Sequence, residues 1–115
     1  MLVFTERRKA APSVSPQQAT LLGNNDGALM LDVRNAADYK TSRVLNARNI
    51  PFAELNKRLS DLQKYRDKPI VLICKTGQTA GSAASMLRKD GYTKVYRMSG
   101  GMLEWGNQGL PLIRK

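Results

Sequence analysis

Apolar residues form two kinds of pattern along this chain of 115 residues, and the two kinds alternate. Short apolar runs at residues 28–33 and 69–73 are typical of strands that are buried on both faces. Residues 54–65 and 80–90 instead carry apolar side chains three to four positions apart, which indicates amphipathic helices. The other expected elements are shorter: an extended piece within residues 44–51, a strand at 94–98, and helices beginning near residues 16, 35 and 102. This alternation predicts an α/β fold, with a small parallel sheet of about five strands and helices on both of its faces.

The first of these helices has a recognisable beginning. Ser15 is an expected N-cap, Pro16 suits the first helical position, and Gln18 completes a capping box with Ser15. The turn residues at 23–27 should end this helix. The residues before Ser15 show no comparable pattern, so we expect residues 1–13 to be a flexible segment and residues 14–115 to form one domain.

The N-terminal segment combines a short apolar run, residues 2–4, with the cations Arg7, Arg8 and Lys9. This order is similar to the end of a membrane anchor with its cationic stop, although a complete span needs ~20 apolar residues. We therefore interpret it as the remnant of a removed anchor, with an ordinary disordered terminus as the alternative. An anchor of this orientation would place the domain in the cytoplasm, tethered to the inner face of the plasma membrane.

The strand at residues 69–73 ends on Cys74, and a short loop containing Gly77 connects it to the next helix. This order predicts that the sulfur lies at the carboxyl edge of the sheet, where a helix N-terminus presents free N–H groups. Such a place stabilises an anion, whether a thiolate or a sulfur species built on it, by up to ~2 kcal/mol. Gly77 supplies the permissive φ that a tight loop of inward N–H groups requires.

Cys74 is the only cysteine, and the chain has no histidine. An intramolecular disulfide, a Cys/His zinc site, and catalysis by Cys-His or Ser-His-Asp groups are therefore excluded. We predict no metal and no cofactor. A single free thiol suits a reducing compartment.

The 19 Lys and Arg residues exceed the 9 Asp and Glu residues, which gives a formal charge of +10. A basic surface of this strength fits an anionic membrane, the steering of anionic substrates, or nucleic acid. Nucleic acid ranks last because the cations are scattered, aromatic residues are only 6%, and no nucleic-acid motif is present. A solvated basic surface without a partner is the simplest alternative.

Several motifs, in order, resemble the rhodanese family of single-domain sulfurtransferases, over roughly residues 15–112. They are Leu31-Asp32-Val33-Arg34 with Asp38-Tyr39, Ala47-Arg48-Asn49-Ile50-Pro51, Cys74-Lys75-Thr76-Gly77, Gly91-Tyr92, Val95-Tyr96, Gly100-Gly101 and Trp105. The resemblance implies that Cys74 takes a sulfane sulfur from a small anionic donor such as thiosulfate, forming a persulfide. A thiol or cyanide acceptor would then remove that sulfur.

The residues around Cys74 receive roles from this resemblance. Lys75 would add positive potential at the mouth of the site, while Thr76, Gln78 and Thr79 would donate hydrogen bonds to an oxyanion. Asp32 and Arg34 are expected to support the site, Asp32 by accepting backbone N–H groups and Arg34 by bracing the loop region. A direct role of this pair in substrate binding is the alternative.

The chain departs from the family pattern at two places. Ser42-Arg43-Val44 stands where the family usually has Gly-His-Ile, and Thr79 stands where the six-residue loop often ends in an arginine that binds the donor. A phosphatase-type Cys-x5-Arg loop is excluded because the sixth residue after Cys74 is Ala80. The second hypothesis is therefore a weakly active or non-catalytic binding module at a membrane.

Overall fold

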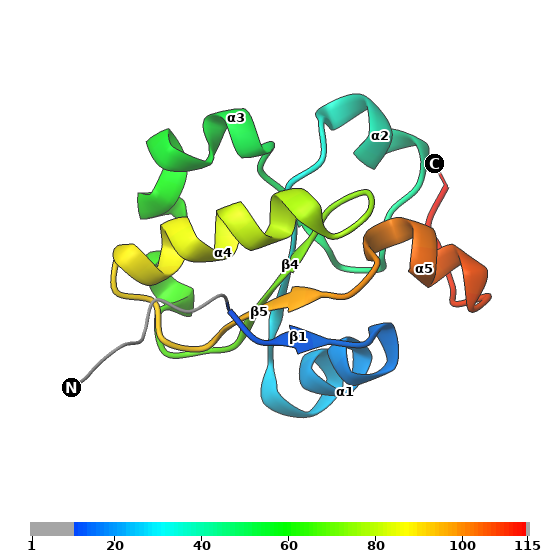
Figure 1. Cartoon of the computed structure of the whole chain (residues 1–115), viewed down its shortest axis with the longest axis horizontal. Coiled ribbons are helices and arrows are strands. Elements are labelled where there is room, and N and C mark those ends of the chain that lie inside the picture. Colours follow the sequence, from blue (N-terminus) through cyan, green and yellow to red (C-terminus); the bar gives the residue numbers. More distant parts are fainter. Residues whose placement is uncertain (1–10, 115) are drawn as a thin grey trace.

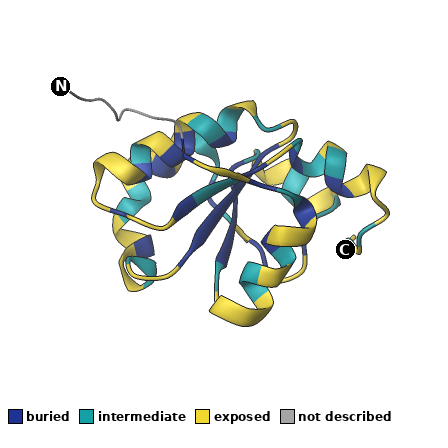
Figure 2. Cartoon of the chain, turned by 60° about the horizontal axis from the view of Figure 1, so that its bottom comes forward, coloured by how far each residue is buried: buried dark blue, intermediate teal, exposed yellow. Residues whose placement is uncertain are grey.

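The computed structural model describes residues 11–114 and shows a five-stranded parallel sheet in the order β1-β5-β4-β2-β3 (Figure 1). The strands are β1 (Ser13–Val14), β2 (Leu29–Asp32), β3 (Arg48–Asn49), β4 (Ile70–Ile73) and β5 (Val95–Met98). Every residue of β2 and β4 is buried, as their continuous apolar runs predicted, and these two strands pair in the middle of the sheet. Figure 2 shows these buried strands in the centre of the molecule, with exposed residues on the outer helices.

Helices cover both faces of the sheet, which confirms the predicted fold class. They are α1 (Pro16–Asp26), α2 (Ala36–Thr41), α3 (Phe52–Leu55), the 3₁₀ helix η2 (Asn56–Tyr65), α4 (Gln78–Lys89) and α5 (Gly101–Asn107). One hydrophobic cluster joins the sheet to α3, η2 and α4, and the other joins it to α1 and α5. The alternation of apolar runs along the chain therefore produces two cores, one on each side of β4.

The capping box at the start of α1 is confirmed. The Ser15 hydroxyl oxygen accepts from the Gln18 N–H at 3.1 Å, and the Gln18 side-chain oxygen accepts from the Ser15 N–H at 2.8 Å. Each of these bonds satisfies a backbone donor that the first turn of a helix leaves unpaired.

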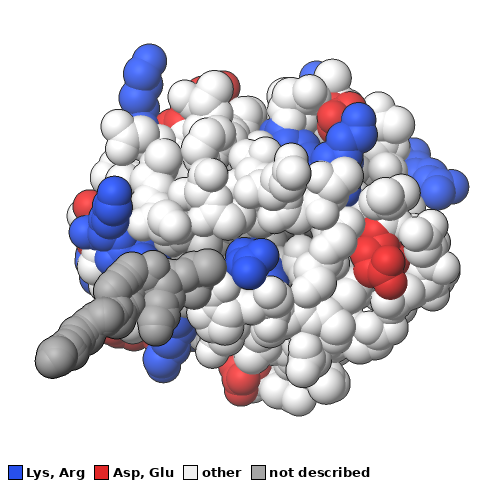
Figure 3. Space-filling model, viewed as in Figure 1, with Lys and Arg blue, Asp and Glu red and all other residues white. Residues whose placement is uncertain are grey.

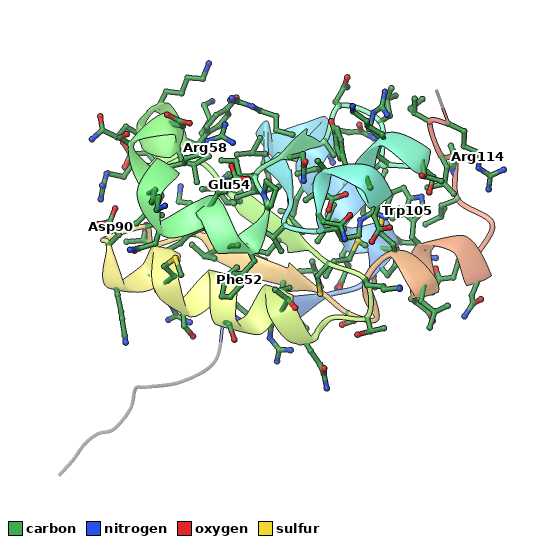
Figure 4. The ribbon with its side chains drawn as sticks, turned by 90° about the horizontal axis from the view of Figure 1, so that it is seen from above. Phe52, Glu54, Arg58, Asp90, Trp105 and Arg114 are labelled. Carbon is green, nitrogen blue, oxygen red and sulfur yellow. The ribbon has the colours of Figure 1, made fainter. Side chains whose placement is uncertain are left out.

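The single helix predicted over residues 54–65 is wrong in type. The segment is α-helical only to Leu55 and continues as a 3₁₀ helix, with a break at Arg58, whose φ is −115°. The Arg58 guanidinium pairs with Asp61 at 3.0 Å and with Glu54 at 3.5 Å (Figure 4). With three residues per turn, Leu59 and Leu62 lie on one face, so the tighter helix still directs both into the core.

The packed domain begins earlier than predicted. Ala11 is 1% exposed, and β1 (Ser13–Val14) forms the edge of the sheet beside β5. The Arg97 N–H donates to the Pro12 oxygen at 3.0 Å, so residues 11–13 belong to the domain. A two-residue edge strand is too short to produce a periodic signal in the sequence. The predicted anchor remnant lies outside the described residues, and no described helix is long and apolar enough to cross a bilayer.

Candidate functional site

Cys74 lies directly after β4 and four residues before α4 begins at Gln78. Figure 1 shows the loop that connects β4 to α4 at the carboxyl edge of the sheet. β4 is flanked by β2 and β5, so the strand that carries the cysteine is the central one. The residue is 3% exposed, and its thiol is free. The predicted placement of the sulfur, between a buried strand and a helix N-terminus, is confirmed.

Two backbone N–H groups donate to the Cys74 sulfur. The Gly77 nitrogen lies 2.9 Å from Sγ and the Ala80 nitrogen lies 3.3 Å from it. Gly77 is the N-cap of α4 and has a φ of +105°, a conformation that L side chains rarely adopt. The first turn of α4 is therefore arranged around the sulfur, in the geometry that favours a negative charge there.

A second helix holds the other side of the same loop. The N–H groups of Met102 and Leu103, in the first turn of α5, donate to the Cys74 oxygen at 2.8 Å and to the Lys75 oxygen at 3.1 Å. The two carbonyl groups of the loop are thus directed toward α5, and the loop keeps its N–H groups for the side of the sulfur. Sequence reasoning did not assign this function to α5.

Gly101 makes this contact between α5 and the loop sterically feasible. A β-carbon at Gly101 would lie 2.3 Å from the Cys74 oxygen and 2.7 Å from the carbonyl carbon and oxygen of Lys75. These are backbone atoms of the loop itself, so no flexible side chain can move aside. The signal in the sequence was the Gly100-Gly101 pair immediately before a short helix.

The side chains of the loop mostly face solvent. Lys75, Thr76 and Gln78 are exposed, while Thr79 is half-buried in the first turn of α4. Within the described residues, both hydrogen bonds to the sulfur come from the backbone and not from these side chains. The structure therefore places the predicted residues around one loop, with the backbone next to the sulfur and the side chains at the rim.

Asp32 and Arg34 form a buried ion pair at the end of β2. Arg34 Nη2 lies 2.7 Å from Asp32 Oδ2, and the two side chains are 8% and 0% exposed. Asp32 also accepts from the Arg34 N–H at 3.0 Å, as predicted for a backbone partner. The second Arg34 contact differs from the expectation, because Nη2 donates to the Ser42 oxygen at 2.6 Å and so braces the end of α2 instead of the Cys74 loop.

The two best-formed cavities in the described part of the chain are not lined by the Cys74 loop. A cavity of about 540 Å³ lies between α1, β2 and the segment that includes Val44 and Arg48, with Trp105 at one side. Within residues 11–114, no group of three cysteine, aspartate or glutamate residues is arranged to hold a metal. The Cys74 loop thus combines a buried sulfur with side chains that are exposed at its rim.

The family of the chain follows from the match of its sequence over this whole unit. The sequence model of the rhodanese-like domain matches residues 15–108, which include the sheet from α1 onward, the Cys74 loop and α5. The chain belongs to the rhodanese-like domain family. The resemblance inferred from the motifs is confirmed.

Solved rhodanese structures share the fold. A rhodanese-related protein from Thermoplasma volcanium aligns with a TM-score of 0.77 and 28% identity, covering 90% of this chain and 99% of that one. A thiosulfate sulfurtransferase from Pseudomonas aeruginosa aligns with a TM-score of 0.76 and 28% identity over 90% of this chain, but over 20% of its own length.

Relatives with similar sequences have differing names. A protein named sulfurtransferase from Allochromatium vinosum is 28% identical over 80% of this chain and 84% of its own length. The uncharacterized protein YqhL of Bacillus subtilis is 37% identical over 70% of this chain, which spans 63% of that relative. A tRNA uridine(34) hydroxylase from Cronobacter sakazakii is 34% identical, and the chain spans only 27% of it. The rhodanese-like domain thus occurs both as most of a protein and as one part of larger ones.

Proposed function

We propose that this rhodanese-like domain is a sulfurtransferase in which Cys74 carries the sulfur as a persulfide. The observation that carries the proposal is the pair of backbone N–H donors on the Cys74 sulfur, Gly77 at 2.9 Å and Ala80 at 3.3 Å. These donors stabilise an anionic sulfur without an imidazole, which this chain lacks. The relative named sulfurtransferase and the family match support the same class of reaction.

The proposed donor is thiosulfate or a similar small anion with an outer sulfane sulfur. The Cys74 thiolate attacks that outer sulfur, forming a new S–S bond, and the bond between the two donor sulfurs breaks. Sulfite leaves with the electron pair, and the negative charge of the thiolate now resides on the outer sulfur of the persulfide. Each step conserves charge and needs no external oxidant.

The proposed acceptor is a thiol or cyanide. An acceptor thiolate attacks the outer sulfur of the Cys74 persulfide, takes that sulfur as its own persulfide, and returns Cys74 as a thiolate. The same N–H donors then face the regenerated anion. Because Lys75, Thr76 and Gln78 are exposed at the rim, they are the side chains that an incoming donor or acceptor meets first.

The loop has no arginine between Cys74 and Ala80, so no bidentate cation closes on the sulfonate end of a donor. We propose that Lys75 supplies positive potential there, while Thr79 offers a hydroxyl from the first turn of α4. This arrangement favours donors held by backbone N–H groups, with weaker capture than an arginine would give.

Intact-mass measurement after thiosulfate treatment tests the proposal. The wild-type chain should gain about 32 Da, the mass of one sulfur, and lose it again on addition of a thiol reductant. Cys74→Ser should show no gain and no transfer to cyanide, because a serine hydroxyl is not ionised near neutral pH. Its circular dichroism and unfolding midpoint should stay close to those of the wild type, which serves as the control for folding.

The outcomes separate the two hypotheses. A wild-type chain that gains no sulfur from thiosulfate or from a small persulfide donor would overturn the sulfurtransferase assignment and favour a binding module. Sulfur gain that persists in Cys74→Ser would overturn the assignment of Cys74.

A further inference from the structure

Six basic residues gather at the end of the molecule opposite the Cys74 loop, and we name this surface the basic pole. They are Lys64, Arg66, Lys68, Arg88, Lys89 and Lys94. Five of them are exposed, and the Arg66 side chain is 41% exposed. Asp67 and Asp90 are the acidic residues within the same segments, so cations dominate this surface.

The segments that carry these cations are tied to each other. Lys94 Nζ donates to the backbone carbonyl oxygen of Asp67 at 3.1 Å, and Arg66 Nη1 donates to the backbone carbonyl oxygen of Asp90 at 2.9 Å. The Ile70 N–H donates to the Lys94 oxygen at 2.9 Å, which joins the starts of β4 and β5. The turn before β4 and the turn before β5 are therefore one surface, whose charges the fold holds side by side.

The first described residues lie at this same end. β1 runs parallel to β5, and Ala11 precedes it, with its oxygen accepting from Arg97 Nε at 3.0 Å. Figure 1 shows that β1 begins on the side of the molecule where α4 ends, and Figure 3 shows Lys and Arg side chains on that side. In the sequence, Arg7, Arg8 and Lys9 come just before Ala11. These three cations precede β1 in the sequence and lie outside the described residues.

We propose that the basic pole binds the anionic surface of a lipid bilayer. A bilayer surface requires many cations on one exposed face and no individual pocket, and this is the arrangement that the two turns present. Nucleic acid fits less well, because single strands are bound by stacking on exposed aromatic rings. Two aromatic residues lie in these segments, and a cation covers each. Tyr92 is 2% exposed, with the Arg66 guanidinium 4.5 Å from its ring centre, and Tyr65 is half-buried, with the Lys64 ammonium 5.5 Å from its ring centre.

This contact would orient the active loop. β4 begins at the basic pole with Ile70 and ends at Cys74, so the two surfaces are separated by the length of the central strand. With the pole against lipid, the Cys74 sulfur and the rim residues Lys75 and Thr76 face away from the membrane. A domain bound through the basic pole would then present its sulfur to partners in solution.

Vesicle cosedimentation tests the proposal with the full chain, at ~0.1 M salt, where the Debye length is ~10 Å. The probes are vesicles of phosphatidylcholine alone and vesicles with about 30% phosphatidylserine, a composition chosen to give a strong surface potential. The pole variant is Lys64→Glu/Lys68→Glu/Lys89→Glu. The matched control, Lys40→Glu/Lys57→Glu/Arg114→Glu, changes the net charge equally at exposed positions outside the pole.

We expect the wild type to bind only the anionic vesicles. Each basic residue near such a surface raises partitioning about fivefold, so loss of three cations should weaken binding of the pole variant at least about 100-fold. The added glutamates act in the same direction, while the control should stay within about tenfold of the wild type. Sulfur transfer in solution should be unchanged in both variants, which shows that they are folded and separates this test from that of the proposed function.

Three results would overturn the proposal. The first is a wild type that does not bind anionic vesicles, and the second is an equal loss in the pole variant and the control, which would assign binding to net charge alone. The third is tighter binding to a single-stranded oligonucleotide at equal phosphate concentration, abolished in the pole variant, which would assign the pole to nucleic acid.

Discussion

Gly101→Ala tests most directly whether the close contact between α5 and the Cys74 loop shapes the site. The new β-carbon would lie 2.3 Å from the Cys74 oxygen and 2.7 Å from two Lys75 backbone atoms, in a residue whose φ is +58°. The positive φ alone costs an alanine about 1–2 kcal/mol, and overpacking against backbone typically adds about 1–3 kcal/mol. We therefore expect the free energy of unfolding to fall by about 2–5 kcal/mol.

The same substitution should affect activity more than stability alone explains. To relieve the contact, the Cys74–Lys75 backbone must move away from α5 by up to about 1 Å, which changes the hydrogen bonds on the sulfur. A displacement of this size at a reacting group can cost about 100-fold in rate. We expect persulfide formation from thiosulfate to slow about 100-fold per folded molecule. Rapid quench with intact-mass detection measures this rate.

Two glycines of the same region provide controls. Gly106→Ala lies inside α5 with no atom within 4 Å of the new carbon, and it should stabilise the chain by up to ~1 kcal/mol without changing the rate. Gly109→Ala has a φ of +68° and equally open space, so it measures the backbone cost alone. If Gly101→Ala resembles Gly109→Ala in both urea unfolding and the rate of persulfide formation, the contact between α5 and the Cys74 loop does not shape the site.

Three further substitutions address the loop, the buried ion pair and the core. Thr79→Arg should lower the Michaelis constant for thiosulfate, by about 1–2 kcal/mol of binding, because it places a cationic fork in the first turn of α4; an unchanged constant would show that this position does not reach the donor. Asp32→Asn should cost about 3–5 kcal/mol in urea unfolding, because it leaves the Arg34 charge buried without its partner; a loss below 1 kcal/mol would contradict this account. Burial raises the pKa of Tyr92, with Arg66 opposing and Asp90 adding to the shift, so the fold favours the neutral phenol. The neutral Tyr92 phenol contributes its full stabilisation below the unfolded pKa of about 10, and this contribution is lost as the pH rises through the folded pKa. Tyr92→Phe should therefore flatten the decline of the unfolding free energy at alkaline pH. Parallel curves for the two chains would refute this role of Tyr92.

The parts of the site that the sequence predicted are local in the chain. The run into Cys74, the glycine at Gly77 and the helix that follows are contiguous, so the apolar pattern and turn chemistry were enough to place the sulfur at a helix N-terminus. The capping box of α1 was predictable for the same reason, since Ser15 and Gln18 are three residues apart.

The parts that the sequence did not predict depend on distant residues. The bonds from Met102 and Leu103 to the Cys74 and Lys75 carbonyls join segments more than 25 positions apart in the sequence, and no local pattern encodes them. The Arg34 contact with Ser42 depends equally on where the chain returns after α2. The 3₁₀ geometry after Leu55 was not predicted, because leucines three residues apart lie on one face in both an α-helix and a 3₁₀ helix.

In the Cys74 loop, backbone groups set the shape, whereas the side chains are exposed at the rim. Its shape depends on backbone groups: N–H donors from Gly77 and Ala80 on the sulfur, and N–H donors from α5 on the carbonyls. No side chain of Lys75, Thr76 or Gln78 is needed for that shape, and all three are exposed. Under the proposed function, substitutions at these positions would change which donor or acceptor is captured while the sulfur keeps its environment. We infer that a threonine in place of arginine at residue 79 alters affinity for the donor, and that the chemistry at Cys74 depends instead on the glycines that let two helix N-termini meet one loop.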